Sequence, residues 1–391
     1  MRIVLKRGKD KPVRRRHPWI FSGAIRQVEG EPQPGDIVEI VASDGQWLAW
    51  AEYNPQSQIR ARTFGWEQDR RPDEAFWRDK LLASIARRRQ LMPDAEAVRL
   101  IFAESDGMPG LIVDRYGPHL VVQCLTAGAE ARKLQTVAHL VDCLQPRSIV
   151  ERDDPIRRKE GLPPVAGVLH GEPPDEPVVI SENGHRFYVD LRSGQKTGFY
   201  LDQAENRRAL AGYCADAEAL NAFSYTGAFA VHALAADAKH VTNLDSSADA
   251  LDMAARNLDL NGFSPERWQN LQADVFQQLR LWRDQGRQFD LIILDPPKFV
   301  TSRRQLDRAA RGYKDINWLA MRLLRPGGLL ATFSCSGLVS RDLFQKIVFG
   351  AALDAGRDVR IIRHFSQGAD HPVLLSFPEG AYLKGLLCHV A

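Results

Sequence analysis

Two short stretches of the sequence carry side chains that could take part in catalysis. The first, "LDPPKF", follows the apolar run "LII" and places Asp295 and Lys298 on either side of two prolines. Proline fixes φ and donates no backbone hydrogen bond, so a strand has to end here. The acid beside such a rigid turn can accept hydrogen bonds from an exocyclic amine, as on cytosine, adenine or guanine. The alternative is that the prolines only terminate a strand.

The second stretch, "TFSCSG" at residues 332–337, places Cys335 between two serines at the predicted end of the following strand. Carbon-5 of a pyrimidine is a weak nucleophile, and a thiolate that adds to carbon-6 converts it into a reactive enamine carbon. Cys335 could supply this thiolate, with Lys298 as an electrostatic helper. A cysteine in an apolar strand often serves only in packing, and we interpret the other four cysteines in that way.

Both stretches depend on a sheet that brings strand ends together. From about residue 180, strand-like runs alternate with helical patterns, as in "ALNAF", "HVTNLD", "NLQAD", "FDLIILD" and "LLATFSCS". This alternation predicts a doubly wound parallel sheet, in which ligands bind beyond the carboxyl ends of the strands. Three further runs close the sequence, "VRIIRHF", "PVLLSF" and "GLLCHV", and the last two are separated by a short loop. We therefore expect the sheet to end in an antiparallel hairpin.

The strand ends also predict which cofactor the sheet binds. The turn after the first strand, "NAFSYTGAF", contains one glycine, Gly227, and lacks the G-x-G-x-x-G pattern of a pyrophosphate site. Asp245 ends the second strand, where its carboxylate can hold both hydroxyls of a ribose. Asp274 ends the third strand and could meet an adenine amino group, or only cap the next helix. A ribose clamp without a phosphate site favours S-adenosylmethionine, whose sulfonium cation is stabilised by nearby acids.

The rest of the chain predicts two domains in addition to the one at 181–391. Residues 1–70 contain short strands separated by Gly and Pro, with a hairpin signal at Asp44-Gly45, and are typical of a small barrel. Residues 71–180 have the pattern of a mixed α/β domain. Five prolines at 163–177 make the end of that domain the best candidate for a linker. A chain of 391 residues is long enough for these separate cores.

The composition and the charge distribution indicate the cellular compartment of the protein and the kind of partner that it binds. No apolar run is long enough to cross a bilayer, the N-terminus lacks the apolar segment of a secretory signal, and the five cysteines contain no C-x-x-C pair. We therefore expect a cytoplasmic protein without a disulfide framework or a structural metal site. Residues 1–20 carry eight Lys or Arg and one acid, in a chain of net charge +3. This basic end predicts binding of a polyanion.

Several motifs resemble those of one known family. "LDPPKF" and "TFSCSG", together with "GQKTGFYLDQAENR" at 194–207, "HPWIFSGAI" at 17–25 and "HPVLLSFPEGAYLKG" at 371–385, resemble the bacterial large-subunit ribosomal RNA cytosine-5 methyltransferases that carry an N-terminal PUA domain. The likeness covers essentially the whole chain. It implies a multidomain α/β protein with a PUA-like β-barrel, a small central α/β domain and a Rossmann-like class I methyltransferase domain with a seven-stranded mixed sheet. It also implies a possible homodimer.

The resemblance further assigns roles to single residues. It makes Cys335 the nucleophile and Asp295 the residue that holds the cytosine edge, while "GQKTGFYLDQ" closes over S-adenosylmethionine. Lys298 occupies the position at which many other RNA cytosine-5 methyltransferases have a second cysteine, so the base that removes the carbon-5 proton is not identified. The predicted cofactor-binding residues are Gln203, Phe223, Tyr225, Thr226, Gly227, Asp245, Ser246, Asp274, Asp295 and Pro296.

The basic N-terminus provides the predicted RNA contacts. Arg14, Arg15 and Arg16 would bind the backbone of large-subunit ribosomal RNA, and Trp19 would stack on a base. Alternatively, Trp19 and Phe21 belong to the core of the barrel. A target base inside structured RNA has to turn out of its stack, which suits a protein that grips the neighbouring phosphates.

Two other functions fit the same sequence. One is S-adenosylmethionine-dependent methylation of an exocyclic amine of guanine or adenine in RNA, which requires no thiol. The other is RNA binding without catalysis, around a vestigial cofactor pocket. Cys335 separates the first of these from cytosine-5 methylation, and cofactor binding tests the second.

Overall fold

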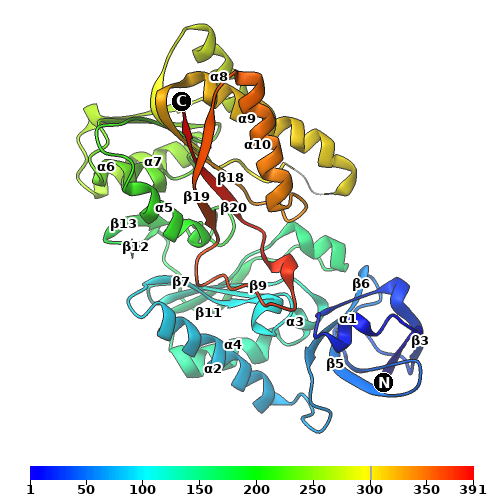
Figure 1. Cartoon of the computed structure of the whole chain (residues 1–391). Helices are drawn as coiled ribbons and strands as arrows, with labels where there is room; N and C mark the ends of the chain where they lie inside the picture. Colours follow the sequence, from blue (N-terminus) through cyan, green and yellow to red (C-terminus); the bar gives the residue numbers. More distant parts are fainter. Residues whose placement is uncertain (300–301) are drawn as a thin grey trace. The chain divides into compact units, whose positions relative to one another are not determined.

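The structure of the protein is a computed structural model that describes residues 1–299 and 302–391 (Figure 1). The chain forms two compact units. The first comprises Met1–Ile180, Val189–Leu201 and Ala369–Gly380, and the second comprises Ser181–Tyr188, Asp202–Gly368 and Ala381–Ala391. The finer division into domains at residues 70 and 180 stays a prediction. No helix among the described residues combines the length and the apolar character that a membrane span requires.

The first unit begins with a six-stranded sheet. Its elements are β1 (Arg2–Leu5), α1 (Lys11–Arg14), β2 (Trp19–Phe21), β3 (Ile25–Glu29), β4 (Ile37–Val41), β5 (Trp47–Tyr53) and β6 (Ile59–Gly65). The strands lie in the order β2-β6-β5-β4-β1-β3. Alternate residues such as Val38 and Ile40 are buried in one core, as expected for strands that cover a core with one face. The predicted hairpin is confirmed, because Asp44-Gly45 joins the antiparallel pair β4 and β5, with Gly45 at φ +86°.

A five-stranded sheet with three helices completes most of the first unit. Its elements are α2 (Glu74–Leu91), β7 (Ala97–Phe102), β8 (Leu111–Tyr116), β9 (His119–Cys124), α3 (Ala127–Ala131), α4 (Lys133–Leu144), β10 (Ser148–Glu151) and β11 (Gly167–Gly171). The order is β11-β10-β9-β8-β7. The prediction of a linker at 163–177 is wrong for β11, which pairs antiparallel with β10. The five residues "GVLHG" contain no proline, so their backbone can join the sheet between the prolines on either side.

The second unit is built on a seven-stranded mixed sheet. Its elements are α5 (Ala204–Ala211), β14 (Glu218–Ala222), α6 (Ala228–Ala235), β15 (His240–Asp245), α7 (Ala248–Leu260), β16 (Trp268–Gln272), α8 (Val275–Asp284), β17 (Phe289–Leu294), α9 (Leu306–Leu323), β18 (Leu324–Ser334), α10 (Arg341–Ala355), β19 (Val359–Ser366) and β20 (Lys384–Val390). The order is β16-β15-β14-β17-β18-β20-β19, with β20 antiparallel to both neighbours and the first five strands parallel. This confirms the predicted doubly wound sheet.

Helices cover both faces of this sheet. Figure 1 shows α6 and α7 on one side and α8, α9 and α10 on the other. The central strand β17 is therefore buried along its whole apolar run, Leu291 to Leu294 at 0% exposure, as a strand between two helical layers must be. A separate two-stranded sheet consists of β12 (Val178–Glu182) and β13 (His185–Val189).

The end of the chain differs from the prediction in one strand. β19 and β20 are antiparallel neighbours, but the apolar run "PVLLSF" at 372–377 is not a strand, and Leu375 is almost wholly exposed. The preceding Asp370 explains the difference. Its carboxylate accepts the Arg99 N–H (3.0 Å) and its carbonyl accepts from Arg88 Nη2 (2.9 Å), so single side-chain bonds hold this segment in place of a ladder. Short 3-10 helices occur at Ser22–Ala24, Ala103–Asp106, Pro155–Glu160, Leu201–Gln203, Pro265–Arg267, Arg303–Gln305 and Pro378–Gly380.

Candidate active site

Three predicted site residues occupy equivalent positions on neighbouring strands of the second unit. Ala222, the last residue of β14, pairs with Leu244 of β15 on one side and with Leu294 of β17 on the other. Phe223, Asp245 and Asp295 therefore each come one residue after this row. Parallel neighbours lie about 4.8 Å apart, so the three side chains start from the same edge of the sheet. This edge is the place at which doubly wound sheets bind ligands.

The turn that follows β14 has an unusual backbone. Phe223 and Tyr225 have φ of 59° and 47°, in the left-handed region that non-glycine residues avoid, and Gly227 has φ of 74°. The turn is held by its neighbours, because Ser224 N–H donates to Leu244 O (3.2 Å) and Tyr225 N–H donates to the Asp245 carboxylate (2.9 Å). Strain of this kind persists only where the surrounding structure imposes it, and it is concentrated at binding sites.

Asp245, the last residue of β15, and Asp274, after β16, both accept a backbone hydrogen bond near the start of the next helix, and Asp274 is the N-cap of α8. The second oxygen of Asp245 accepts the Ser247 N–H (3.0 Å) at the start of α7, next to the exposed Ser246. Asp274 is exposed and accepts the Gln277 N–H (2.9 Å) at the start of α8, which is the capping alternative weighed for it. Carboxylate oxygens have lone pairs beyond those that these hydrogen bonds use. The ribose and adenine contacts of these residues stay predictions.

The turn also contains polar groups suited to a cofactor. The hydroxyls of Ser224 and Thr226 are buried and have no hydrogen-bond partner among the described residues. A buried hydroxyl without a partner is costly, so such groups usually face a ligand or a water molecule. With Asp245 beside them, these hydroxyls fit the amino acid and ribose parts of S-adenosylmethionine. Gly227 has a packing role in the same turn, because a Cβ there would come within 2.9 Å of the Cβ of Ala254 on α7.

Asp295 occupies a setting that favours its neutral form. Gln203 Nε2 donates to its carboxylate (3.1 Å), while Gln203 Oε1 accepts from Asn206 Nδ2 (2.6 Å), which fixes the direction of the side-chain amide. Burial raises the pKa of Asp295 to about 7, and the negative charge of Asp202 contributes to the rise. Asp202 in turn accepts the hydroxyl of Tyr382. A carboxyl with a pKa near neutrality can both donate and accept a hydrogen bond at physiological pH.

Four aromatic rings contact one another near these strand ends. Phe299 follows the two prolines and lies 4.7 Å from Tyr313 of α9, centroid to centroid, and 5.8 Å from Phe276 of α8. Phe223 is 6.4 Å from both Phe276 and Phe299. The four rings thus form a continuous apolar wall from the turn after β14 to α9. Of the two prolines, Pro296 is buried and Pro297 is exposed.

Cys335 lies directly after β18, beside the strand that ends in Asp295. Thr332 of β18 pairs with Leu294, so Asp295 is one residue and Cys335 three residues beyond this pair. Cys335 is partly accessible, and the preceding Ser334 donates a hydrogen bond to the Tyr313 hydroxyl (3.0 Å). The register therefore brings the predicted nucleophile and the predicted base-holding acid to one edge of the sheet.

The cation that contacts the loop after Cys335 is Lys384, which was not among the site residues predicted from the sequence. Lys384, the first residue of β20, is 4% exposed and donates to the carbonyls of Ser336 and Val339, the latter at 2.7 Å. Burial lowers the pKa of Lys384, and the charge of Lys298, the exposed residue predicted as the helper, contributes in the same direction. The motif "YLKG" contained Lys384, but only the antiparallel register, which pairs it with Ser334, places it beside Cys335.

The predicted RNA contacts lie in the first unit. Arg15 and Arg16 are exposed after α1, whereas Arg14 is paired with Asp10 (2.5 Å). Trp19 is half-buried and donates to Glu104 (2.8 Å), and Phe21 is 51% exposed, so the core alternative is wrong for Phe21. An open hollow of about 570 Å³ lies here, lined by Gly8, Lys9, Lys11, Pro12, Val13, Trp19, Ile20, Phe21, Gly23 and Ala24.

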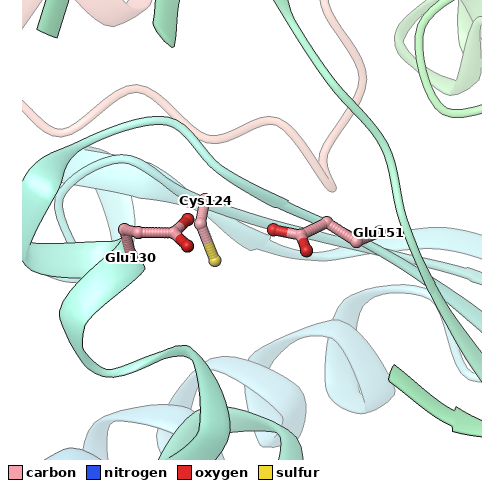
Figure 2. A group of neighbouring side chains, drawn as sticks. All are labelled: Cys124, Glu130 and Glu151. Atoms are coloured by element: carbon pink, nitrogen blue, oxygen red, sulfur yellow. The ribbon is translucent and has the colours of Figure 1, made fainter. Parts of the chain in front are cut away.

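A further group of candidate ligands, in the first unit, has a different character. Figure 2 shows the thiol of Cys124 between the carboxylates of Glu130 and Glu151. Lys133 donates to both carboxylates (2.6 and 3.0 Å), and Arg157 donates to Glu130 (2.9 Å). Burial raises the pKa of Cys124 to about 12, so the thiol stays protonated. Cations already neutralise this group, which favours an ion-pair network over a metal centre.

The remaining structural cysteines agree with their interpretation as packing residues. Cys214 and Cys388 are buried, and burial raises the pKa of each to about 12. Cys143 lies on α4 and is partly accessible. Cys335 differs from all four by its place at the carboxyl edge of the large sheet.

Comparison with known proteins identifies the architecture. Two family models match the chain, a PUA-like domain over residues 3–66 and an S-adenosylmethionine-dependent methyltransferase over residues 156–350. Ribosomal RNA large subunit methyltransferase I of Erwinia tasmaniensis is 48% identical over 393 residues, covering 100% of this chain and 99% of that protein. The protein of the same name from Aliivibrio fischeri strain MJ11 is 51% identical over 392 residues, covering 99% of both chains.

Solved structures support the same fold. A SAM-dependent methyltransferase from Streptococcus mutans matches with a TM-score of 0.88 at 20% identity, over 100% of both chains. A methyltransferase solved in complex with SAH matches with a TM-score of 0.89 at 19% identity, again over both whole chains. The PUA-like domain, the class I methyltransferase sheet and the cofactor predicted from the sequence are thereby confirmed. The chain belongs to the ribosomal RNA large subunit methyltransferase I family of S-adenosylmethionine-dependent enzymes.

Proposed function

We propose that this enzyme methylates carbon-5 of a cytosine in large-subunit ribosomal RNA and that Cys335 is its nucleophile. The names of the relatives support ribosomal RNA of the large subunit as the substrate. The observation that carries the proposal for the base is the register of β17 and β18, which brings Cys335 and Asp295 to one edge of the sheet. Of the five cysteines, Cys335 is the one at the carboxyl end of a strand of this sheet.

In this proposal the chain provides a nucleophile and a base-holding acid. The Cys335 Sγ forms a bond to carbon-6 of the cytosine, and the electron pair of the carbon-5–carbon-6 double bond becomes available at carbon-5. S-adenosylmethionine, when bound, supplies the electrophilic methyl group. The carbon-5 proton then leaves to a base and the Sγ–carbon-6 bond breaks, which restores the aromatic ring and the thiolate. The base that receives the proton is not assigned.

The pKa of Asp295 suits the proposed contact with cytosine. The ring presents an acceptor, N3, next to a donor, the exocyclic amine. A protonated carboxyl donates to N3 and withdraws electron density from carbon-6, while the ionised form accepts from the amine. With its pKa raised to about 7, Asp295 has both forms available near neutral pH. Gln203 orients the carboxyl through its 3.1 Å hydrogen bond.

The proposed RNA contacts outside the site are those of the basic N-terminus. Arg15 and Arg16 are exposed and would bind phosphates, and the exposed ring of Phe21 adds an aromatic surface beside Trp19. The homodimer implied by the resemblance stays a prediction, which sedimentation of the purified chain would test.

Methylation of an exocyclic amine is the second candidate, since a "DPP" turn can hold such an amine without any thiol. The experiment that separates the two uses Cys335→Ala with large-subunit ribosomal RNA and a labelled methyl donor. We expect the variant to lose methyl transfer while it binds S-adenosylmethionine as tightly as the wild type in calorimetry. Cys143→Ala, which removes another partly accessible thiol, serves as the matched control and should remain active. Full turnover by Cys335→Ala would favour amine methylation.

A further inference from the structure

Lys384 is a buried cation, and the groups around it indicate which anion compensates its charge. Its side chain is almost completely inaccessible, yet its hydrogen-bond partners are two neutral carbonyls, those of Ser336 and Val339. Burying an ammonium group without an opposite charge is strongly unfavourable. A lysine that served only to close a loop could be replaced by a neutral donor at lower cost. The setting therefore requires an anion nearby in some state of the protein.

The charged groups that act on Lys384 leave one candidate for this anion. They are Cys335 and the two cations Arg341, at the start of α10, and Lys298, after the two prolines. Burial lowers the pKa of Lys384 to about 8; a charge on Cys335 acts to raise it, and the two cations act to lower it further. Among these charged groups, Cys335 is the one whose charge opposes that of Lys384.

The geometry of the loop links the two residues further. Lys384 pairs with Ser334 across the antiparallel strands β18 and β20, so its backbone lies opposite the residue that precedes Cys335. Its Nζ donates to the carbonyls of Ser336, the residue after Cys335, and of Val339. An ammonium group has three hydrogens, and these two bonds use two of them. Lys384 is consequently joined to the residues directly before and after Cys335.

We propose that Lys384 is a positioning residue that holds the Cys335 loop on β20 and stabilises the thiolate of Cys335. Deprotonation breaks the S–H bond of Cys335 and releases the proton to solvent, while Lys384 keeps its own three protons. The thiolate electron pair is then the pair that bonds to carbon-6 of the base. The inference rests on the proposed function for the use of the thiolate, but the thiolate itself can be measured without RNA.

The test measures the rate at which iodoacetamide alkylates Cys335 as a function of pH, followed by peptide mass spectrometry. We expect Lys384→Met, which keeps the length of the side chain, to lower the rate at pH 7 roughly tenfold and to move the pH midpoint upward, since a neighbouring lysine lowers thiol pKa values by about one unit or more. Lys384→Arg keeps the charge and should retain most of the rate. Lys346→Met removes an exposed lysine of α10 and should have no effect.

Two controls separate the possible outcomes. Calorimetric binding of S-adenosylmethionine by each variant reports whether the second unit is folded, and Lys384→Arg supplies the comparison if Lys384→Met binds poorly. An unchanged midpoint in a folded Lys384→Met variant, or a shift caused instead by Lys298→Met, would overturn the proposal. A shifted midpoint in an enzyme that forms no 5-methylcytosine would retain this inference and reject the proposed function.

Discussion

Replacement of Asp295 by asparagine should stabilise the protein at alkaline pH while it removes activity. Burial raises the pKa of Asp295 from 3.8 to about 7, and a difference of one in pKa corresponds to about 1.36 kcal/mol. The folded state therefore holds this proton more tightly than the unfolded state. The stability that this proton contributes is fully present below the unfolded-state pKa of 3.8. It is lost progressively as the pH rises to the folded-state pKa of about 7. The linkage relation gives a loss of about 1.5 kcal/mol at pH 5 and about 4 kcal/mol at pH 8.

Asparagine has no charge to desolvate, and its oxygen can still accept the hydrogen bond from Gln203. Asp295→Asn should therefore gain stability over the wild type, by an amount that grows by about 2.5 kcal/mol between pH 5 and pH 8. Urea denaturation of the cofactor-free protein at the two pH values measures this difference. Asp252→Asn, at an exposed position of α7, is the control and should show no comparable pH dependence. An Asp295→Asn variant whose advantage is the same at both pH values would refute the assignment of a near-neutral pKa.

Two further substitutions test the elements that position the site. Gly227→Ala should destabilise the protein by about 1–3 kcal/mol more than Gly262→Ala, because both glycines have φ of 74° but only at Gly227 would a Cβ meet another atom, the Ala254 Cβ at 2.9 Å. Equal losses in urea denaturation would contradict the packing argument for that turn. Arg207→Met should cost about 3–5 kcal/mol, because the buried Glu182 accepts two hydrogen bonds from Arg207 (2.7 and 2.6 Å) and would lose its cation. Arg208→Met, on the exposed face of the same helix, is its control, and a similar effect of the two would show that the buried ion pair is not the cause.

The strand ends could be predicted from the sequence because a local sequence pattern identifies each of them. Alternating strands and helices fix the carboxyl edge of a parallel sheet, and Asp245 and Asp295 each stand at the end of an apolar run. Asp274 also stands at the end of a predicted strand, and the hydrogen bond that it accepts from the Gln277 N–H shows why this position alone is ambiguous. A carboxylate at the end of a strand is also one residue before a helix, so a cap and a ligand contact have the same sequence pattern.

Features that depend on contacts between residues far apart in the sequence were not predicted. Lys384 lies 49 residues after Cys335 in the chain, and only the register of β18 with β20 brings it to the cysteine loop. The apolar run at 372–377 satisfies a local strand pattern, yet Asp370 anchors that part of the chain by bonds to Arg88 and Arg99. The strained backbone at Phe223 and Tyr225 has no local signal either, since both residues are poor choices for positive φ.

The most direct test of the account is a covalent trap. RNA that contains 5-fluorocytidine at the target position cannot lose a proton from carbon-5, so a cysteine that has added to carbon-6 stays attached. With S-adenosylmethionine present, we predict an adduct that survives denaturant, maps by peptide mass spectrometry to Cys335, forms equally with Cys143→Ala and is absent with Cys335→Ala. Turnover of ordinary RNA without any such adduct, or an adduct on another residue, would contradict the account.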